Sequence, residues 1–475
     1  MPRAIESPRR ATLFSLVIGL WVTITGPILN AQRSGPYGVG PVWWSAGAGG
    51  VLPWEEEYEN ADGWVSILNR NGAVRADGHP FFEPLGRNHR ACVTCHQPSN
   101  GMSVTPASLR DRWDETKGRD PVFAAIDGSN CPDLPQDAAG SHSLLLNRGL
   151  FRITLPWPPR ASNGAAVIPE FRIEVVRDPT GCNLSSTYGV KGREQVISVF
   201  RRPRLPANLD YVVKGRLALM ADGRELSLRD QAVNAIMTHE QAEKPPAYNQ
   251  LVQIVDFESQ IYAAQSADIR AGRLNEKEGP LLGTDNLAGG KVDPLANPVL
   301  LSFKVWKMQT GEGELDVQRE FRVSAARGAE VFFARLFSIR GASATTQEKL
   351  YTCASCHAAG SARWMDIATT NVRPRQAAPE LPLFRITCDA TAPAHPVFGR
   401  TFYSQDPGRA LISGKCADVG AIVPQQLRAL AARAPYFANG SARTLREVVD
   451  FYDRQWNIGY SEREKQDLTN FLRIL

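Results

Sequence analysis

The chain has 475 residues, which is enough for two to four domains and leaves no shortage of core-forming sequence. Hydrophobic residues make up 43% and charged residues 22%, a globular composition that excludes a disordered or fibrous protein. The net charge of +5 is too small to indicate a nucleic-acid partner.

The chain begins with an apolar run behind a basic pair. Arg9 and Arg10 precede this run, which ends at a loose match to a small-residue cleavage site at Ala31. We therefore predict a signal peptide over residues 1–31 and export to the periplasm, an oxidising compartment in which spare cysteines can pair. The alternative is an uncleaved anchor, since the run is long enough to span a bilayer. Only in that case does the protein contact a membrane.

Residues 32–70 are rich in Gly, Pro and Trp, which predicts an extended N-terminal arm rather than a domain. The pattern C-x-x-C-H then occurs twice in the chain, as Cys92-Val-Thr-Cys95-His96 and as Cys353-Ala-Ser-Cys356-His357. In this pattern two thiols form thioethers with the vinyl groups of one haem, and the histidine ligates its iron. A zinc site needs a second thiol pair nearby, and a redox motif needs a thioredoxin-like context. Neither motif has these, so we predict two covalently bound haem c groups with the two histidines as proximal ligands.

Four further cysteines lie in Pro/Gly/Asp-rich loops, two after each motif. Four cysteines allow three pairings. Because each pair follows its own motif, we predict the disulfides Cys131–Cys182 and Cys388–Cys416.

Between the two motifs the pattern changes several times. Residues 148–155 and 169–176 alternate apolar and polar side chains, which predicts strands or a hairpin. Residues 228–237, and a second segment from about 247 to 267, carry apolar residues at helical spacing. Residues 279–298 are rich in Gly, Pro and Asn without a period, which predicts a crossover.

The second half opens with an amphipathic helix at 324–333 and closes with two capped helices. Thr444 and Ser461 each begin an S/T-x-x-E capping box. Apolar residues then recur on one face of the first of these helices, and Tyr452 lies on that face. Tyr452 is therefore aimed at whatever this face covers.

Together these segments predict a mainly α fold with two cytochrome c-like haem domains, long loops and a few short strands. The N-terminal haem domain spans residues 71–290 and the C-terminal haem domain spans residues 291–475.

Several segments resemble the bacterial di-haem cytochrome c peroxidases and their MauG-type relatives. They are Arg327-Gly-Ala-Glu-Val-Phe, the second C-x-x-C-H, the stretch from Leu427 to Tyr452, and Asp222-Gly-Arg-Glu. Arg433-Ala-Pro-Tyr-Phe is also similar to the di-haem rubber oxygenase branch. The resemblance implies one haem for chemistry and one for electron delivery. It also implies a small redox protein or other electron donor as partner, and hydrogen peroxide or oxygen as substrate.

The resemblance further implies a role for Tyr452. In the family, the helix that carries this residue supplies the second axial ligand of the C-terminal haem, which is methionine in peroxidases and tyrosine in MauG-type members. We therefore predict Tyr452 as an iron ligand beside His357. The alternative is a tyrosine packed on the haem edge.

The N-terminal haem lacks the family's distal histidine, because residues 97–113 contain none and offer only Met102. We therefore expect this haem to have an open face that binds peroxide or oxygen. The family's distal acid follows the Gln-Ala helix, a position that falls near Glu240, so we predict Glu240 or His239 as the catalytic proton carrier. The alternative is that both cap the helix and meet solvent.

Two departures from the family concern its other sites. His142 occupies a segment where the family often has asparagine, which makes it a second candidate near the first haem and argues against the family's interdomain calcium. Calcium is the further cofactor that the resemblance leaves open.

An aromatic residue between the haems is the other family feature. The candidates are Trp113, Trp157 and Trp364, and the alternative is that these side chains belong to the core.

These features predict a periplasmic di-haem c-type oxidoreductase, a peroxidase/MauG-like enzyme. In it the N-terminal haem handles peroxide and the C-terminal haem relays electrons. The alternatives are a di-haem electron carrier without peroxidase activity, and a di-haem oxygenase that acts on an apolar substrate.

Overall fold

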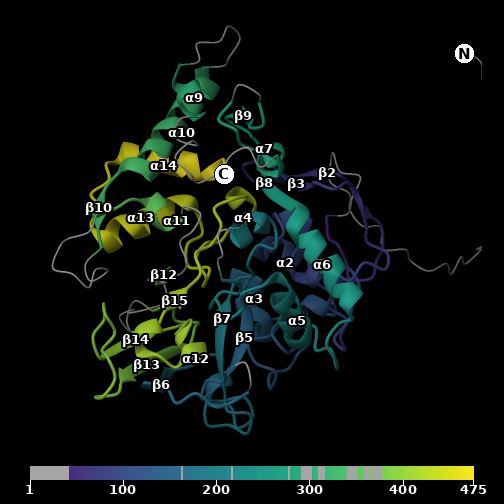
Figure 1. Ribbon diagram of the computed structural model, residues 1–475, viewed down its shortest axis with the longest axis vertical. Coiled ribbons are helices and arrows are strands. Elements are labelled where there is room, and N and C mark those ends of the chain that lie inside the picture. Colours follow the sequence, from purple (N-terminus) through teal and green to yellow (C-terminus); the bar gives the residue numbers. More distant parts are fainter. Residues whose placement is uncertain are drawn as a thin grey trace, which may run out of the picture. The chain divides into compact units, whose positions relative to one another are not determined.

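The computed structural model describes residues 42–161, 164–214, 218–276, 279–289, 302–308, 316–339, 350–357, 364–365 and 377–475 (Figure 1). The predicted signal peptide at 1–31 lies outside the described residues, as do residues 32–41 of the predicted arm and residues 290–298 of the predicted crossover. Within the described ranges, no helix is both long enough and apolar enough to cross a membrane.

The predicted mainly α fold of two cytochrome c-like domains is wrong. The chain is a mixed α/β protein with 35% helix and 19% strand, and its strands form small antiparallel sheets. Local patterns underestimate the strand content because many partners are far apart in sequence. For example, β6 (Phe171–Arg177) pairs with β13 (Leu383–Cys388). Periodicity indicates a strand only where its two faces differ in polarity, and it does not reveal the partner.

A four-stranded antiparallel sheet packs against the first C-x-x-C-H motif. Its order is β2 (Glu55–Asn60), β3 (Gly63–Asn69), β8 (Ile261–Asp268) and β9 (Gly272–Arg273). The first two strands come from the predicted arm. Their apolar side chains join Val93 of the motif in one buried cluster, so this sheet supports the motif from behind.

The helix predicted over about 247–267 ends early. The helix α6 spans Tyr248–Gln260, and β8 follows it directly. All eight residues of β8 are buried, so the strand shows no alternation of apolar and polar residues. Its alanines suit a helix by propensity, and pairing with β3 overrides that preference.

The predicted strands near 148–155 and 169–176 are present, but they form no hairpin. The strand β5 (Phe151–Pro156) pairs with β7 (Val196–Arg201). The strand β6 pairs instead with β13, which also pairs with β14 (Thr401–Ser404). This three-stranded sheet therefore joins residues from both sides of the predicted boundary at 290, and the boundary itself stays a prediction.

Both predicted disulfides are confirmed. Cys131 is bonded to Cys182 and Cys388 to Cys416, with Cα–Cα distances of 5.2 and 5.8 Å. The second disulfide ties the end of β13 to a short 3₁₀ helix, Cys416–Asp418. Two disulfides are consistent with an extracytoplasmic location.

The second motif lies in a helical region. Its elements are α9 (Lys304–Met308), α10 (Asp316–Ala334), α11 (Cys353–His357), α13 (Leu445–Trp456) and α14 (Glu462–Arg473). Both predicted N-caps are present: Thr444 Oγ1 accepts from the backbone N–H of Glu447 at 3.1 Å, and Ser461 Oγ accepts from that of Glu464 at 3.2 Å. The capping box is complete only at Ser461, because Glu447 accepts from the N–H of Arg443 instead of that of Thr444.

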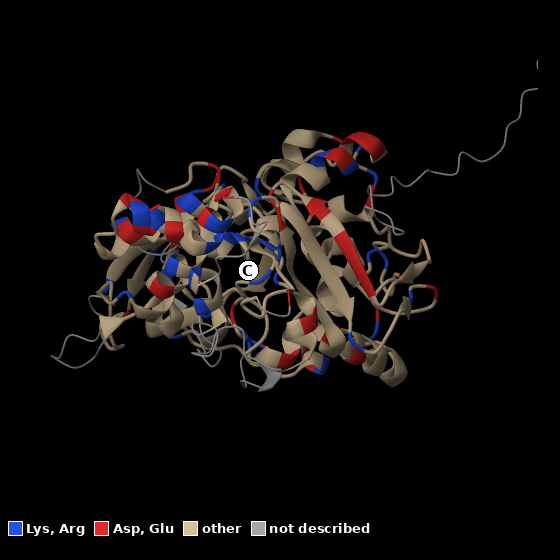
Figure 2. Cartoon of the chain, turned by 90° about the horizontal axis from the view of Figure 1, so that it is seen from above, with Lys and Arg blue, Asp and Glu red and all other residues tan. Residues whose placement is uncertain are grey.

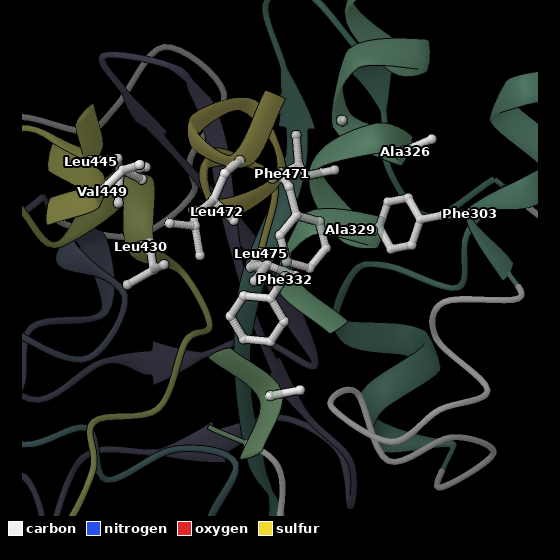
Figure 3. Close-up of a cluster of buried hydrophobic side chains, with 14 of the residues drawn as sticks. Phe303, Ala326, Ala329, Phe332, Leu430, Leu445, Val449, Phe471, Leu472 and Leu475 are labelled. Carbon is white, nitrogen blue, oxygen red and sulfur yellow. The ribbon is translucent and has the colours of Figure 1, made fainter. Parts of the chain in front are cut away.

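The helices α10 and α14 cross closely over a buried apolar cluster. Figure 3 shows Phe332 of α10, Phe471 of α14 and Val449 of α13 among its members. A Cβ atom at Gly328 would lie 1.9 Å from the carbonyl oxygen of Asp467, so only glycine fits at the crossing. This packing holds α13 and its Tyr452 against the region of the second motif.

The remaining helices and strands complete the described chain. In the N-terminal half, the helices are α1 (Cys92–Cys95), α2 (Pro106–Thr116), α3 (Ser143–Arg148), α4 (Leu209–Lys214), α5 (Leu228–His239) and α7 (Thr284–Ala288). Two-residue ladders pair β1 (Val51–Leu52) with β4 (Val74–Arg75), β10 (Phe337–Ser338) with β11 (Leu350–Tyr351), and β12 (Trp364–Met365) with β15 (Ala421–Ile422). The helix α12 spans Ala410–Ser413. Figure 2 shows basic and acidic positions interspersed along the chain.

Candidate functional site

The first C-x-x-C-H motif borders a cavity of about 260 Å³. Cys95 and His96 form one part of its wall. Strand β5, the segment from Arg201 to Pro206, helix α5 and helix α6 supply other parts. These elements are far apart in sequence, and the tertiary fold brings them together around the motif.

His96 is held in one tautomer. Its Nδ1 lies 3.3 Å from the carbonyl oxygen of Met102, and a carbonyl only accepts, so Nδ1 carries the proton. Burial lowers the pKa of His96 to about 4, which keeps the ring neutral near pH 7. A neutral imidazole with Nε2 free is the form that ligates iron. Met102 therefore serves His96 through its backbone, while its side chain is buried in the apolar cluster behind the motif.

The second motif borders a cavity of about 230 Å³. Phe332 of α10 and five residues of α13, Tyr452 among them, line it together with Cys353, Cys356 and His357. The prediction that the face of α13 aims Tyr452 toward the second motif thus agrees with the geometry, whereas ligation of iron by Tyr452 stays a prediction. The tyrosine ring packs edge-on against Phe437, with 5.9 Å between ring centroids.

His357 is also neutral. Burial lowers its pKa to about 4, and the backbone of Gln425 offsets only part of this effect. Gln425 lies near the ring, yet Nδ1 of His357 has no regular hydrogen-bond partner among the described residues. The neutral ring at the cavity wall leaves Nε2 as the nitrogen that can ligate iron.

The four motif cysteines are free thiols in the protein chain. Burial raises the pKa of Cys95 and Cys353 to about 11, that of Cys356 to about 12, and that of Cys92 well above its usual value. A redox-active C-x-x-C pair requires a lowered thiol pKa. Among the described residues, no group of three or more His, Cys, Asp or Glu side chains forms a metal site. Both thiols and the histidine of the second motif line the second cavity, and Cys95 and His96 line the first, with Cys92 one helical turn before His96. This donor set fits two haem c groups.

The two cavities share a wall. Arg202, Pro203, Pro424, Gln425 and Leu427 line both of them. The first cavity also reaches Cys356 and His357 of the second motif. Groups bound in the two cavities would therefore be close neighbours.

A polar stripe of α5 faces the first cavity. Gln231, Ala235 and His239 line it, and their spacing of four residues places them on one face of the helix. The Nδ1 atom of His239 lies 2.7 Å from Oδ2 of Asp127, whose other oxygen forms an ion pair with Arg90. The structure thus brings together an Arg90–Asp127–His239 chain that the sequence analysis did not contain.

The surroundings of His239 determine its protonation state and its tautomer. Burial, together with the nearby Arg224 and Arg90, lowers the pKa of His239 to about 3, so the ring is neutral near pH 7. Its Nδ1–H then donates to Asp127, and Nε2 keeps a lone pair. The side chain of His239 is 33% exposed, and it lines the first cavity. His239 is therefore placed to accept a proton there.

Glu240 is placed differently. It is not among the residues that line either cavity. Its Oε2 accepts from the backbone N–H of Leu85 at 3.2 Å, and its Oε1 lies 3.6 Å from Sγ of Cys92. Only 3% of Glu240 is exposed, so it does not meet solvent, and burial raises its pKa to about 8. Of the two predicted proton carriers, His239 faces the cavity and Glu240 faces the motif.

Glu258 of α6 lines the first cavity, and the sequence analysis missed it. It is buried, and its Oε2 has no hydrogen-bond partner among the described residues. Burial raises its pKa to about 8. A signal was present, because Leu251, Ile254 and Glu258 follow the spacing of one helix face, which puts an acid on the buried side.

The other predicted candidates do not line the cavities. Both ring nitrogens of His142 face backbone carbonyls, of Gly128 at 2.8 Å and Gln136 at 3.0 Å. Trp113 packs against Phe123 and His142, and Trp157 packs against Phe171. These contacts belong to the core. The side chain of Trp364 lies outside the described residues.

Comparisons with known proteins identify no relative. A scan against protein-family models finds no match, and a search of curated proteins finds none either. The resemblance to the di-haem peroxidases stays a prediction that rests on the motifs quoted above.

Proposed function

We propose that the protein is a periplasmic di-haem c-type oxidoreductase of the peroxidase/MauG-like type. The observation that carries the proposal is the pairing of each C-x-x-C-H motif with its own cavity, whose wall contains a half-buried, neutral histidine that can ligate iron. The wall shared by the two cavities supports electron transfer between them. Electrons come from a small redox protein or another donor.

The residues that would hold the two haems follow from the motifs. Cys92 and Cys95 would form thioethers in the first cavity with His96 as ligand, and the second motif would do the same in the second cavity. When bound, each haem supplies iron that changes oxidation state. The chain fixes the ligand tautomer through Met102 and keeps both histidines neutral by burial.

His239 moves the proton in the first cavity. Nε2 of His239 would accept a proton from hydrogen peroxide in this cavity and hold it only briefly, because a pKa of about 3 disfavours the imidazolium, while Asp127 orients the ring through Nδ1. His239 would then return this proton to the other peroxide oxygen. The two electrons that reduce both oxygens to water would come from the bound haems and their electron donor, and two further protons would come from solvent. The Arg90–Asp127 ion pair keeps the carboxylate charged and in place. Glu240 contributes through its contact with Cys92 rather than by proton transfer.

Tyr452 would hold the iron of the haem in the second cavity together with His357. Its support is its place in the same cavity wall as His357. An anionic tyrosine ligand is a hard donor that favours ferric iron and lowers the reduction potential. The second cavity therefore suits the storage of an oxidised state.

Spectroscopy of the mature ferric protein tests this function. We expect the optical and EPR spectra to show one high-spin haem that responds to peroxide, together with a second haem that is low-spin. Two low-spin haems unchanged by peroxide would contradict the proposal and favour a pure electron carrier. Turnover of an apolar substrate with oxygen, but not with peroxide, would favour the oxygenase. Sequencing the N-terminus of the periplasmic protein tests the cleavage at Ala31.

A further inference from the structure

Three arginines at the wall between the cavities have no acidic partner among the described residues. Arg202 and Arg204 follow strand β7, and Arg433 lies in the segment before α13. Arg202 lines both cavities, Arg204 lines only the first, and Arg433 lines only the second. Arg202 and Arg433 are buried, with 7% and 8% of their surfaces exposed.

The hydrogen bonds of these arginines go to backbone carbonyls. Arg202 donates to the carbonyls of Arg148, Val104 and Arg433 at 2.7–3.1 Å. Arg204 donates to those of Val423 and Pro424 at 2.7 and 2.6 Å. Arg433 donates to those of Gln426, Arg428 and Ala429 at 2.6–3.3 Å. Carbonyl dipoles orient the guanidinium groups but do not neutralise their charges.

The neighbouring Arg201 shows the contrast. It binds Asp406 through Nε at 2.6 Å and Asp222 through Nη1 at 2.8 Å, so both its charge and its donors are satisfied. Asp222 is close enough to favour the charged form of Arg204, but it is already shared by Arg201 and Arg224. Arg201 is thus fully paired. Among the described residues, Arg202 and Arg204 of the same segment have no carboxylate of their own.

The acids of the cavities do not fill this role. Among its described residues, the second cavity has no aspartate or glutamate in its lining, and its charged side chains are Arg202 and Arg433. The first cavity contains Asp127, which already pairs with Arg90, and Glu258, which burial keeps protonated. Buried charges without partners are costly, and Arg202 and Arg433 also repel one another. The wall is therefore complementary to anions that enter from the cavities.

We propose that Arg202, Arg204 and Arg433 form a carboxylate-binding site that anchors the propionate groups of both haems at the shared wall. This inference rests on the proposed function. Guanidinium groups bind carboxylates through short, charge-assisted hydrogen bonds, and they stay charged in buried sites better than lysine does. Arg204 holds carboxylates in the first cavity and Arg433 holds them in the second. Arg202 contributes to both.

Spectroelectrochemical titration of the mature di-haem protein tests the proposal. An arginine beside a propionate offsets its negative charge, so loss of the arginine favours ferric iron and lowers the midpoint potential of that haem. We expect R204Q to lower only the potential of the N-terminal haem, R433Q only that of the C-terminal haem, and R202Q both. The lysine variant R202K keeps the positive charge, so the midpoint potentials of both haems should stay close to those of the native protein.

Arg152 offers a matched control. It is buried like Arg202 and Arg433, donates to the carbonyl of Ile126 and the hydroxyl of Ser198, and lines neither cavity. We expect R152Q to leave both potentials unchanged. Potentials that stay the same in all three cavity variants, or shift equally in R152Q, would overturn the proposal.

A soluble carboxylate is the other source of the same chemistry. Acetate titrated at constant ionic strength distinguishes the two, because a haem propionate is not displaced by it. Potentials that vary with acetate in the native protein, but not in R202Q, would assign the site to a soluble anion and overturn the propionate assignment. A haemochrome assay that finds fewer than two covalent haems would instead refute the proposed function, and this inference with it.

Discussion

Replacing Glu258 by glutamine should stabilise the protein above neutral pH. The Glu258 carboxyl is 3% exposed and its Oε2 has no hydrogen-bond partner among the described residues, so its ionised form is strongly disfavoured in the folded state. Burial raises its pKa from 4.5 to about 8. The unfolded chain ionises near pH 4.5 while the folded chain stays protonated, so the free energy of unfolding falls as the pH rises from 4.5 to 8.

The size of this effect follows from the pKa difference. At about 1.4 kcal/mol per pKa unit, a shift of this size removes up to about 4–5 kcal/mol at pH 8 and above, and about 3 kcal/mol at pH 7. Glutamine has the same shape and never ionises, so it avoids this penalty. The difference between E258Q and the native protein should therefore be near zero at pH 4 and grow with pH.

Urea denaturation of the mature protein at pH 4, 6 and 8.5 measures this difference. The exposed Glu59 of strand β2 provides the control, since E59Q should not change the free energy of unfolding at any of these pH values. A constant difference between E258Q and the native protein across the range would refute the reasoning. So would destabilisation by E258Q at high pH, because that would require the carboxylate to be paired.

The remaining predictions concern proton transfer, ligation and packing. H239A should slow the reaction with peroxide at pH 7 by about a hundred-fold to ten-thousand-fold in stopped-flow measurements, and D127N by less; an unchanged rate in H239A would rule out His239 as the base. Y452F should alter the optical and EPR spectra of the C-terminal haem alone, and identical spectra would exclude tyrosine ligation. G328A should lower the free energy of unfolding by about 1–3 kcal/mol because of the close helix crossing, whereas G140A, where a Cβ meets open space, should not; equal effects would contradict the packing argument.

The parts of the fold that were predictable from the sequence depend on short-range physics. Thr444 and Ser461 cap helices because their hydroxyl groups satisfy N–H groups three residues later, and such a signal is complete within one turn. The disulfides could be predicted because each cysteine pairs within its own loop region. Strand pairing depends on residues more than 200 positions apart, as between β6 and β13, and no local pattern encodes it.

The same distinction applies to the site. The six motif residues that would bind haem are adjacent in sequence, so their chemistry could be predicted from spacing alone. His239 was chosen together with Glu240 by counting along a helix, and counting does not tell which of two neighbours faces the cavity. Asp127 is 112 residues away from His239, and its role emerges only when both meet at one wall. Glu258 could have been found, because an acid on an apolar helix face is a local signal.

The wall between the cavities links the two halves of the proposed mechanism. Pro424 and Gln425 line both cavities, and Gln425 also lies beside the ring of His357, so one short segment contacts the second motif and the space beside the first. Arg204 donates to the carbonyls of Val423 and Pro424, which fixes this segment against the strand that carries Arg202. A change of charge in one cavity therefore acts on the other through the shared wall. The potentials of the two haems should be coupled, so that reduction of one shifts the midpoint of the other, and this coupling should weaken in R202Q.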